Sequence, residues 1–254
     1  MTFSLAKRRT FRRTKVFKLF GLSEAEAALL LEGVTEEGAG LSVVFCVNFP
    51  EMLVKLRAEG DEKMAVAALL NRAAEKARER LGGYVFAEDG ETMDTVVAAL
   101  FRETGFTLSL AESCTGGLVA KRITDVPGSS AYFLEGIVTY SNAAKAQLLS
   151  VPKRLLDEKG AVSPEVAVAM ADGARKLAGS DIALAVTGIA GPDGGTPEKP
   201  VGTVYMALAD PAGCEAKRYN FHGDREEIRL ITSFAALEWL RKRLLSLRSS
   251  EKVG

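Results

Sequence analysis

Residues 106–124 read FTLSLAESCTGGLVAKRIT, and this stretch decides the fold. Its first part, Phe106 to Ala111, is apolar and predicts a buried strand, whereas Gly116 to Thr124 predicts a helix. A short polar turn that contains Ser113 joins the two. A buried strand that leads directly into a helix is typical of α/β proteins, in which helices cover the faces of a largely parallel sheet.

The same alternation of strands and helices continues on both sides of this stretch. Further strands are predicted at 135–140, 181–186 and 202–209, and further helices at 92–104, 143–149, 164–177 and 225–247. Ser163 followed by Pro164 marks one helix start, because serine caps a helix and proline suits its first turn. We therefore expect residues 91–254 to form a three-layer α/β/α sandwich with much of its sheet parallel.

The first 90 residues have a different, more charged texture. Ser23 and Glu26 form the pattern of a capping box, which predicts a short helix. The elements that follow are predicted as strands at 41–49, 52–57 and 84–87 and as a long helix at 62–80. The polar run at 88–90 then indicates a boundary. Residues 1–90 are thus expected to form a small α+β domain of their own.

The bulk composition excludes several classes of protein. The chain has 254 residues with 33 basic and 33 acidic side chains, so its net charge does not favour nucleic acid or membrane. No apolar stretch approaches the roughly 20 residues of a membrane span, and three widely spaced cysteines suit a reducing cytoplasm. His222 is the only histidine, which excludes multi-histidine metal sites, and no metal is expected.

One segment departs from this even charge. Seven basic residues crowd the first twenty positions without an acid among them: Lys7, Arg8, Arg9, Arg12, Arg13, Lys15 and Lys18. Such a run can contact nucleic acid. Because the rest of the chain is not basic, we expect a solvated N-terminal arm instead, and we do not expect nucleic acid as a partner.

Three polar segments follow apolar strands, where open α/β sheets bind their ligands. In the first, Ser113 lies beside a helix N-terminus, whose free N–H groups favour a developing anion and suit a nucleophile. Ser113 and Thr115 can equally be simple helix caps, with Gly116 and Gly117 allowing close packing. Taken alone, the residues leave both interpretations open.

The second segment, residues 139–145, ends in Lys145 within the first turn of a predicted helix. The helix dipole opposes a cation there and lowers a lysine pKa, so Lys145 can act as a base toward a serine. A solvated surface lysine is the alternative. Ser141 or Asn142 can cap this helix.

The third segment, residues 187–195, holds four glycines and follows a buried strand. Its backbone N–H groups can approach an anion, although the spacing matches neither a Walker A loop nor a dinucleotide fingerprint. Near the last helix, Arg225 can reach a phosphate or carboxylate, or it can lie on the surface behind an Asp224 cap.

Together these segments resemble one family, the CinA C-terminal domain. The motifs that carry the resemblance are Ala-Glu-Ser-Cys-Thr-Gly-Gly at 111–117, Val-Thr-Tyr-Ser-Asn-x-x-Lys at 138–145, Gly-Ala-Val-Ser at 160–163, Thr-Gly-Ile-Ala-Gly-Pro-Asp-Gly-Gly at 187–195, Lys-Pro-Val-Gly-Thr-Val at 199–204 and Gly-Asp-Arg at 223–225. They occur in the family's order across roughly residues 93–248.

The resemblance implies an amidohydrolase that converts nicotinamide mononucleotide to nicotinate mononucleotide and ammonia, without a cofactor. The family's serine nucleophile and lysine fall on Ser113 and Lys145. Its catalytic tyrosine falls on Tyr140, which is expected to orient the lysine or the amide. The oxyanion is expected on backbone N–H groups between Cys114 and Gly117. Substrate contacts are expected from Thr115, Gly116, Gly117, Thr187, Gly188, Gly191, Gly194 and Arg225. Family members also suggest self-association, as a dimer or larger.

Residues 11–90 resemble the KH-like middle domain of long CinA proteins, chiefly through the run Phe-Lys-Leu-Phe-Gly-Leu-Ser-Glu at 17–24. A clear Gly-x-x-Gly loop of RNA-binding KH domains is missing. The N-terminal molybdopterin-binding-like domain of the long proteins, with its pyrophosphatase activity, is expected to be absent. Two alternatives to the deamidase stay open: a silent pyridine-nucleotide-binding module and a nucleic-acid-associated protein.

Overall fold

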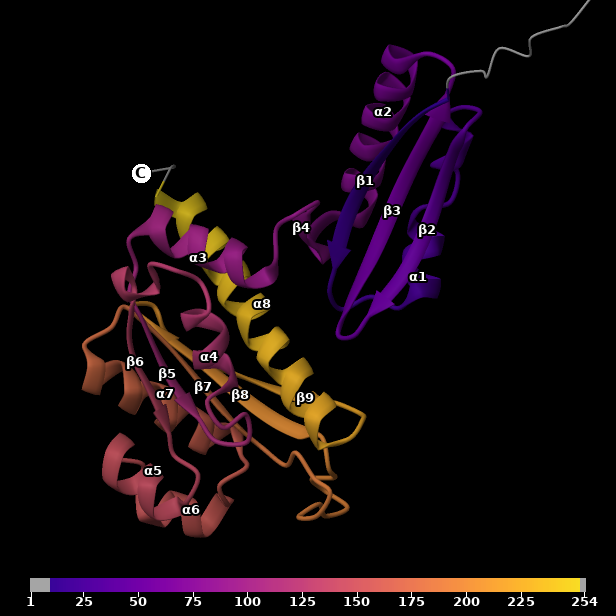
Figure 1. Ribbon diagram of the computed structural model, residues 1–254. Helices are drawn as coiled ribbons and strands as arrows, with labels where there is room; N and C mark the ends of the chain where they lie inside the picture. The colour runs from indigo at the N-terminus through magenta and orange to yellow at the C-terminus, as the bar shows by residue number, and fades with distance from the viewer. Residues whose placement is uncertain (1–9, 252–254) are drawn as a thin grey trace, which may run out of the picture. The chain divides into compact units, whose positions relative to one another are not determined.

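Two separate β-sheets organise the protein in the computed structural model, which describes residues 10–251 (Figure 1). The chain divides into two units between Thr92 and Met93. The first unit contains a four-stranded sheet and the second a five-stranded one. The fold is therefore mixed α/β, as expected from the sequence.

The first unit is an antiparallel sheet with helices on one face. Its strand order is β2-β3-β1-β4. The elements are β1 (Phe11–Leu19), α1 (Glu24–Leu30), β2 (Leu41–Asn48), β3 (Glu51–Gly60), α2 (Lys63–Leu81) and β4 (Val85–Glu88). Helix α2 packs against β1 and β3. Alternate residues of β3, from Met52 to Ala58, are buried in the core beneath it, so the other face of the sheet is left without a helix of this unit.

Local patterns in this unit are confirmed. Ser23 caps α1, its side chain accepts the Glu26 N–H, and the Glu26 carboxylate accepts the Ser23 N–H in return. The two predicted strands pair as the hairpin β2–β3. The long helix and the short strand also lie where the pattern places them.

The basic N-terminal run is not simply a solvated arm, and this expectation was wrong for residues 11–19. They form β1, which lies between β3 and β4. Phe17 and Leu19 are fully buried, and Lys18 between them points to the opposite face of the strand. Cross-strand partners offset part of the positive charge of this strand. Arg12 lies opposite Glu59 on β3 and forms an ion pair with it. The expected arm residues Lys7, Arg8 and Arg9 lie outside the described residues.

The second unit contains the strand order β6-β5-β7-β8-β9. Its elements are α3 (Met93–Thr104), β5 (Leu108–Glu112), α4 (Leu118–Thr124), β6 (Phe133–Val138), α5 (Asn142–Leu149), α6 (Lys153–Lys159), α7 (Pro164–Ala178), β7 (Ile182–Gly188), β8 (Thr203–Asp210), β9 (Gly213–Asn220) and α8 (Arg225–Glu251). Strands β5, β6 and β7 are parallel, whereas β8 and β9 pair antiparallel. The sequence pattern did not predict β9, because its residues are mostly exposed and polar.

Helices cover both faces of this sheet and complete the expected three layers. Helix α7 packs on β7 and β8, with α5 and α6 beside it, whereas α8 packs with α3 and α4 on the opposite face (Figure 1). Strands β5, β7 and β8 are almost wholly buried, as strands covered on both faces must be. Among the helices of residues 10–251, none combines the length and apolar character that a membrane crossing needs.

The sheet topology brings several polar turns to one edge. The parallel strands β5, β6 and β7 all end at the same edge, where their following turns meet. Strand β9 is antiparallel to β8, which is antiparallel to β7, so β9 also ends there. The turn after β9 leads into α8 and carries Arg225 to this edge.

One close contact positions α5 and can be tested directly. A Cβ atom on Gly173 of α7 would lie 2.1 Å from the Leu149 carbonyl oxygen at the end of α5. Alanine normally stabilises a helix relative to glycine, but here it must push α5 away from α7. We expect Gly173→Ala to lower the free energy of unfolding by about 2–3 kcal/mol, measured by urea denaturation.

The matched control for this prediction is Gly90→Ala. A Cβ atom at Gly90 meets nothing within 4 Å, and no unusual backbone angle opposes it. A Gly173→Ala variant as stable as wild type would show that α5 is not seated against α7 as described.

Candidate active site at the carboxyl edge of the second sheet

The turn after β5 holds Ser113 in a fixed position. The Ser113 N–H donates to the Val186 carbonyl of β7 at 2.9 Å. Gly116 and Gly117 then adopt positive φ angles of 60° and 91°, which glycine takes without strain. These angles reverse the chain, and the Gly116 N–H returns to the Ser113 carbonyl at 3.1 Å. Ser113 is 9% exposed at the start of this turn.

Glu112 anchors the same turn from below, a role that the sequence analysis did not assign. Its side chain is 1% exposed, and its carboxylate accepts the backbone N–H groups of Gly117, Val119 and Ala120 at 2.9, 3.2 and 2.8 Å. These are donors at the start of α4 that the helix itself leaves unpaired. A negative charge is favoured there by the helix dipole as well.

Lys145 reaches Ser113 from the first turn of α5. Its Nζ lies 3.0 Å from Ser113 Oγ and donates to the Thr139 carbonyl at 2.7 Å. Ser141 caps α5 and accepts the Ala144 N–H, which resolves the choice between Ser141 and Asn142. The Nζ–Oγ distance is within the hydrogen-bond reach of a nucleophile and its base.

The surroundings of Lys145 favour its neutral form. The side chain is 1% exposed, and its two hydrogen-bond partners are uncharged. Loss of hydration on burial lowers the pKa of Lys145 from its ordinary value of 10.5. Burial has the opposite effect on the neighbouring thiol and raises the pKa of Cys114 to about 12. The thiol therefore stays protonated near neutral pH, and Ser113 is the better nucleophile of the two.

These groups open into a pocket of about 280 Å³. It is lined by Ser113, Cys114, Tyr140, Lys145, Ala161, Val162, Thr187, Gly188, Ile189, Ala190, Gly191, Asp193, Gly194 and Arg225. The lining therefore includes the predicted nucleophile, base, glycine loop and arginine, which come from segments far apart in the sequence. The volume lies near the lower end of the roughly 300–1,000 Å³ found for small-molecule sites.

Arg225 joins two walls of this pocket. Its guanidinium donates to the Gly191 carbonyl and to the Tyr140 hydroxyl, both at 2.7 Å. Asp224 caps α8 by accepting the N–H groups of Glu226 and Glu227, so Arg225 is the first residue of that helix. A guanidinium has five N–H donors, so others remain for an anionic ligand.

Thr187 supports the pocket from the end of β7. It is 1% exposed, and its hydroxyl donates to the Ala161 carbonyl at 2.8 Å. This bond links the glycine loop to the Gly-Ala-Val-Ser segment at 160–163. That segment belongs to the resemblance, but no role was predicted for it.

Some predicted contacts are placed differently by the structure. Thr115, Gly116 and Gly117 do not line the pocket, because they turn beneath it into α4. The Gly116 and Gly117 N–H groups already have acceptors in Ser113 and Glu112, so they are not free to hold an oxyanion. The Tyr140 hydroxyl contacts Arg225 rather than Lys145.

The residues that prediction missed are of two kinds. Ala161, Val162, Ile189, Ala190 and Asp193 line the pocket beside the predicted residues. All five lie inside the quoted motifs, which was the signal available for finding them. Arg229 is different: it donates to the Thr115 carbonyl at 2.8 Å from α8, and nothing local to Arg229 indicates this contact. His222 is exposed and does not line the pocket.

Comparison with known proteins identifies the family. The model of the CinA C-terminal domain matches residues 90–244, which is more than half of the chain. The chain belongs to the CinA family. The CinA KH domain model, described as that of a damage-inducible protein, matches residues 14–87, so the first unit is a KH-like domain.

Curated relatives of the CinA family match almost the whole chain. A CinA-like protein of Geotalea uraniireducens (strain Rf4) is 80% identical over 248 residues, which cover 98% of this chain and 59% of the relative. A CinA-like protein of Geobacter sulfurreducens (strain ATCC 51573 / DSM 12127 / PCA) is 60% identical over 92% of this chain and 57% of the relative. The chain thus spans less than three fifths of the length of these relatives.

Solved CinA structures resemble part of the chain. The competence/damage-inducible protein CihA from Agrobacterium tumefaciens is 43% identical with a TM-score of 0.57, covering 58% of this chain and 91% of that one. A CinA superfamily protein from Klebsiella pneumoniae 700603 is 36% identical with a TM-score of 0.59. The match covers 61% of this chain and 96% of that protein.

Proposed function

We propose that the second unit hydrolyses the carboxamide of nicotinamide mononucleotide, giving nicotinate mononucleotide and ammonia. One observation carries the proposal: a buried lysine lies 3.0 Å from a serine hydroxyl at the wall of a pocket that also holds an arginine. A serine with a lysine base suits acyl transfer from an amide. The resemblance of the motifs to nicotinamide-mononucleotide deamidases supplies the substrate.

The reaction divides into two steps. In the first, the Ser113 hydroxyl donates its proton to neutral Lys145, and Oγ attacks the carboxamide carbon. Lys145 returns the proton to the departing nitrogen, which leaves as ammonia and leaves an ester on Ser113. In the second, water loses a proton to Lys145 and attacks the ester. The nicotinate carboxylate departs and Ser113 regains its hydrogen.

Only part of the donor set expected at Cys114 to Gly117 is available for the oxyanion of each tetrahedral intermediate. The Gly116 and Gly117 amides are engaged, which leaves the Cys114 and Thr115 amides of the same turn for this role. They follow the nucleophile directly, a position from which backbone N–H groups stabilise oxyanions in other hydrolases.

Arg225 is the proposed partner of the substrate phosphate. It lines the same pocket as Ser113, and its contact with the Gly191 carbonyl holds the glycine loop beside it. Arginine binds phosphate oxygens through its planar fork of donors. Tyr140 keeps this guanidinium in place, a supporting role that differs from orienting Lys145.

The test is ammonia release by the purified chain from nicotinamide mononucleotide, nicotinamide riboside and the dinucleotide NAD. We expect turnover of the mononucleotide and weak turnover of the riboside, which offers Arg225 no phosphate. NAD is expected to react poorly because the pocket is small. Binding of the mononucleotide without ammonia release would favour a silent nucleotide-binding module instead.

The pH dependence of this reaction follows from the Lys145 pKa. Only neutral Lys145 accepts the serine proton, and the neutral fraction grows as pH rises through the lysine pKa. Because burial lowers that pKa below 10.5, the rate should rise with pH and level off before ordinary lysines titrate. The measurement is kcat/KM for the mononucleotide from about pH 6.5 to about pH 10. A rate that falls over this range would contradict a lysine base.

A further inference from the structure

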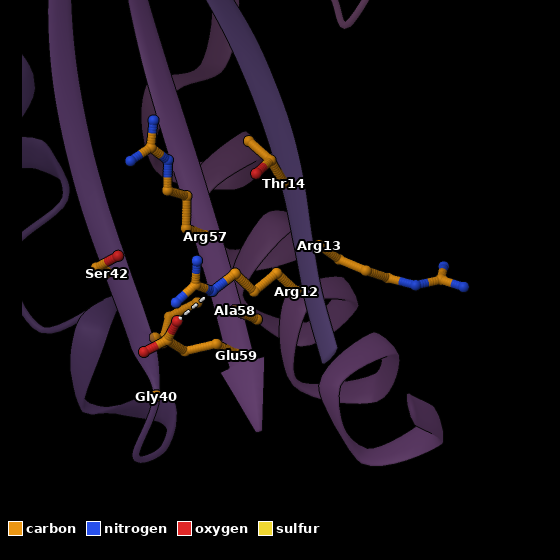
Figure 2. A pocket seen from close by; sticks show the side chains of 9 residues that line it. Arg12, Arg13, Thr14, Gly40, Ser42, Arg57, Ala58 and Glu59 are labelled. Carbon is orange, nitrogen blue, oxygen red and sulfur yellow. Dashed lines mark hydrogen bonds and ion pairs between the residues drawn. The ribbon is translucent and has the colours of Figure 1, made fainter. Parts of the chain in front are cut away.

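The face of the first sheet that α2 does not cover carries a concentration of basic side chains. Residues that alternate with the buried ones point to this face, which we call the open face. On β1 and β3 its members are Arg12, Thr14, Val16, Lys18, Glu51, Leu53, Lys55, Arg57 and Glu59. Neighbouring positions on β2 include Ser42, which lies opposite Arg57. A hollow of about 640 Å³ opens at this end of the sheet (Figure 2), and it is lined by Arg12, Arg13, Thr14, Gly40, Leu41, Ser42, Arg57, Ala58 and Glu59.

The charges on this face are not balanced. Glu51 and Glu59 stand at the two ends of β3, where Glu51 accepts from Asn48 and Glu59 pairs with Arg12 at 2.9 Å. Within residues 10–251, no acidic partner is found for Lys18, Lys55 or Arg57. These three cations therefore keep their full attraction for an external anion.

The arrangement fits a chain of phosphates better than a single small anion. Lys55 and Arg57 are two residues apart on one strand, which separates their stems by about 6.8 Å along the open face. Successive phosphates of an extended nucleic acid strand are spaced on a similar scale. The hydroxyls of Thr14 and Ser42 flank Arg57 across the sheet and lack partners among the described residues. Hydroxyl and guanidinium donors are typical phosphate contacts.

We propose that the open face binds the phosphate backbone of a single nucleic acid strand. The open-face positions of β1 and β3 contain no aromatic side chain, so stacking on bases cannot contribute there. Binding is therefore weak, independent of base sequence and strongly weakened by salt. This surface belongs to the first unit and acts independently of the deamidase chemistry.

The experiment measures binding of the full chain to fluorescein-labelled single-stranded RNA and DNA of mixed sequence by fluorescence anisotropy. Arg57→Glu is expected to weaken binding about tenfold at low salt and to flatten the dependence of log K on log salt. The matched control is Arg72→Glu, which changes the net charge equally. Arg72 is exposed on α2, which packs on the other face of the sheet, and it does not line the hollow. The control is expected to bind within about twofold of wild type.

A gain of affinity provides a second arm that loss of folding cannot imitate. Glu59→Gln frees Arg12 from its ion pair and is expected to tighten binding severalfold and to steepen the salt dependence. Equal effects of Arg57→Glu and Arg72→Glu would overturn the proposal, as would the absence of wild-type binding at low salt. Displacement of the RNA by polyglutamate at an equal concentration of charge would also overturn it, because the surface would then bind carboxylate polyanions as well as phosphates.

Discussion

Replacing Lys145 by Met is expected to lower kcat for ammonia release from nicotinamide mononucleotide by about 10³-fold. Methionine has nearly the length of lysine and is apolar, so it fills the same buried space without a base. Ser113→Ala should cause a loss of similar size, because it removes the nucleophile. The double variant should be little worse than either single one, since the two residues act as a unit.

The control for this pair of variants is Lys153→Met. Lys153 opens α6, is exposed, and does not line the pocket. Its replacement should leave kcat unchanged. Thermal unfolding of each variant separates a loss of chemistry from a loss of fold. Activity that survives in both Ser113→Ala and Lys145→Met would refute the assigned roles.

Glu112→Ala is expected to reduce the free energy of unfolding by about 3–5 kcal/mol, the largest effect on stability that we anticipate. The substitution leaves three N–H groups at the start of α4 without their acceptor in a buried place. Glu112→Gln should cost less than Ala, because one oxygen still accepts while the amide nitrogen faces N–H donors. The measurement is the urea midpoint together with its slope.

A surface carboxylate offers the comparison that this prediction needs. Glu103 on α3 forms an exposed ion pair with Arg248 at 2.8 Å, and Glu103→Ala should cost no more than about 1 kcal/mol. Because Glu112 also holds the turn after Ser113, its loss should lower kcat even where the protein remains folded. A Glu112→Ala variant as stable as wild type would show that the carboxylate is not the cap of α4.

The residues of the candidate site were predictable where a polar group directly follows a buried strand. Ser113 follows the buried strand β5, and Thr187 and the glycine loop stand at the end of the buried strand β7. Lys145 lies in the helix after the partly exposed strand β6, and the structure brings all of them to one pocket. Parallel strands end at a common edge, so strand periodicity alone places these segments together. The resemblance supplied their roles, which periodicity cannot.

The expectations that the structure overturned share a different cause, because each depends on pairing with a distant segment. The basic run at residues 11–19 looked solvated because its charge was weighed above its apolar residues Phe17 and Leu19, yet pairing with β3 and β4 makes it an interior strand. Strand β9 is polar because it lies at a sheet edge, and only pairing with β8 reveals it. The Gly116 and Gly117 amides looked free because their acceptors depend on how the turn folds back.

By itself, the sequence determined the local elements: buried strands, helix caps at Ser23, Ser163 and Asp224, and glycines where the chain must reverse. These follow from backbone preferences and from residues within a few positions of one another. Only the tertiary structure decided which partner each polar group meets. Arg225 reaches Tyr140 across 85 positions, and Lys145 reaches Ser113 across 32. The reason is that hydrogen-bond partners are chosen by sheet order and burial, which are long-range properties that a local pattern does not contain.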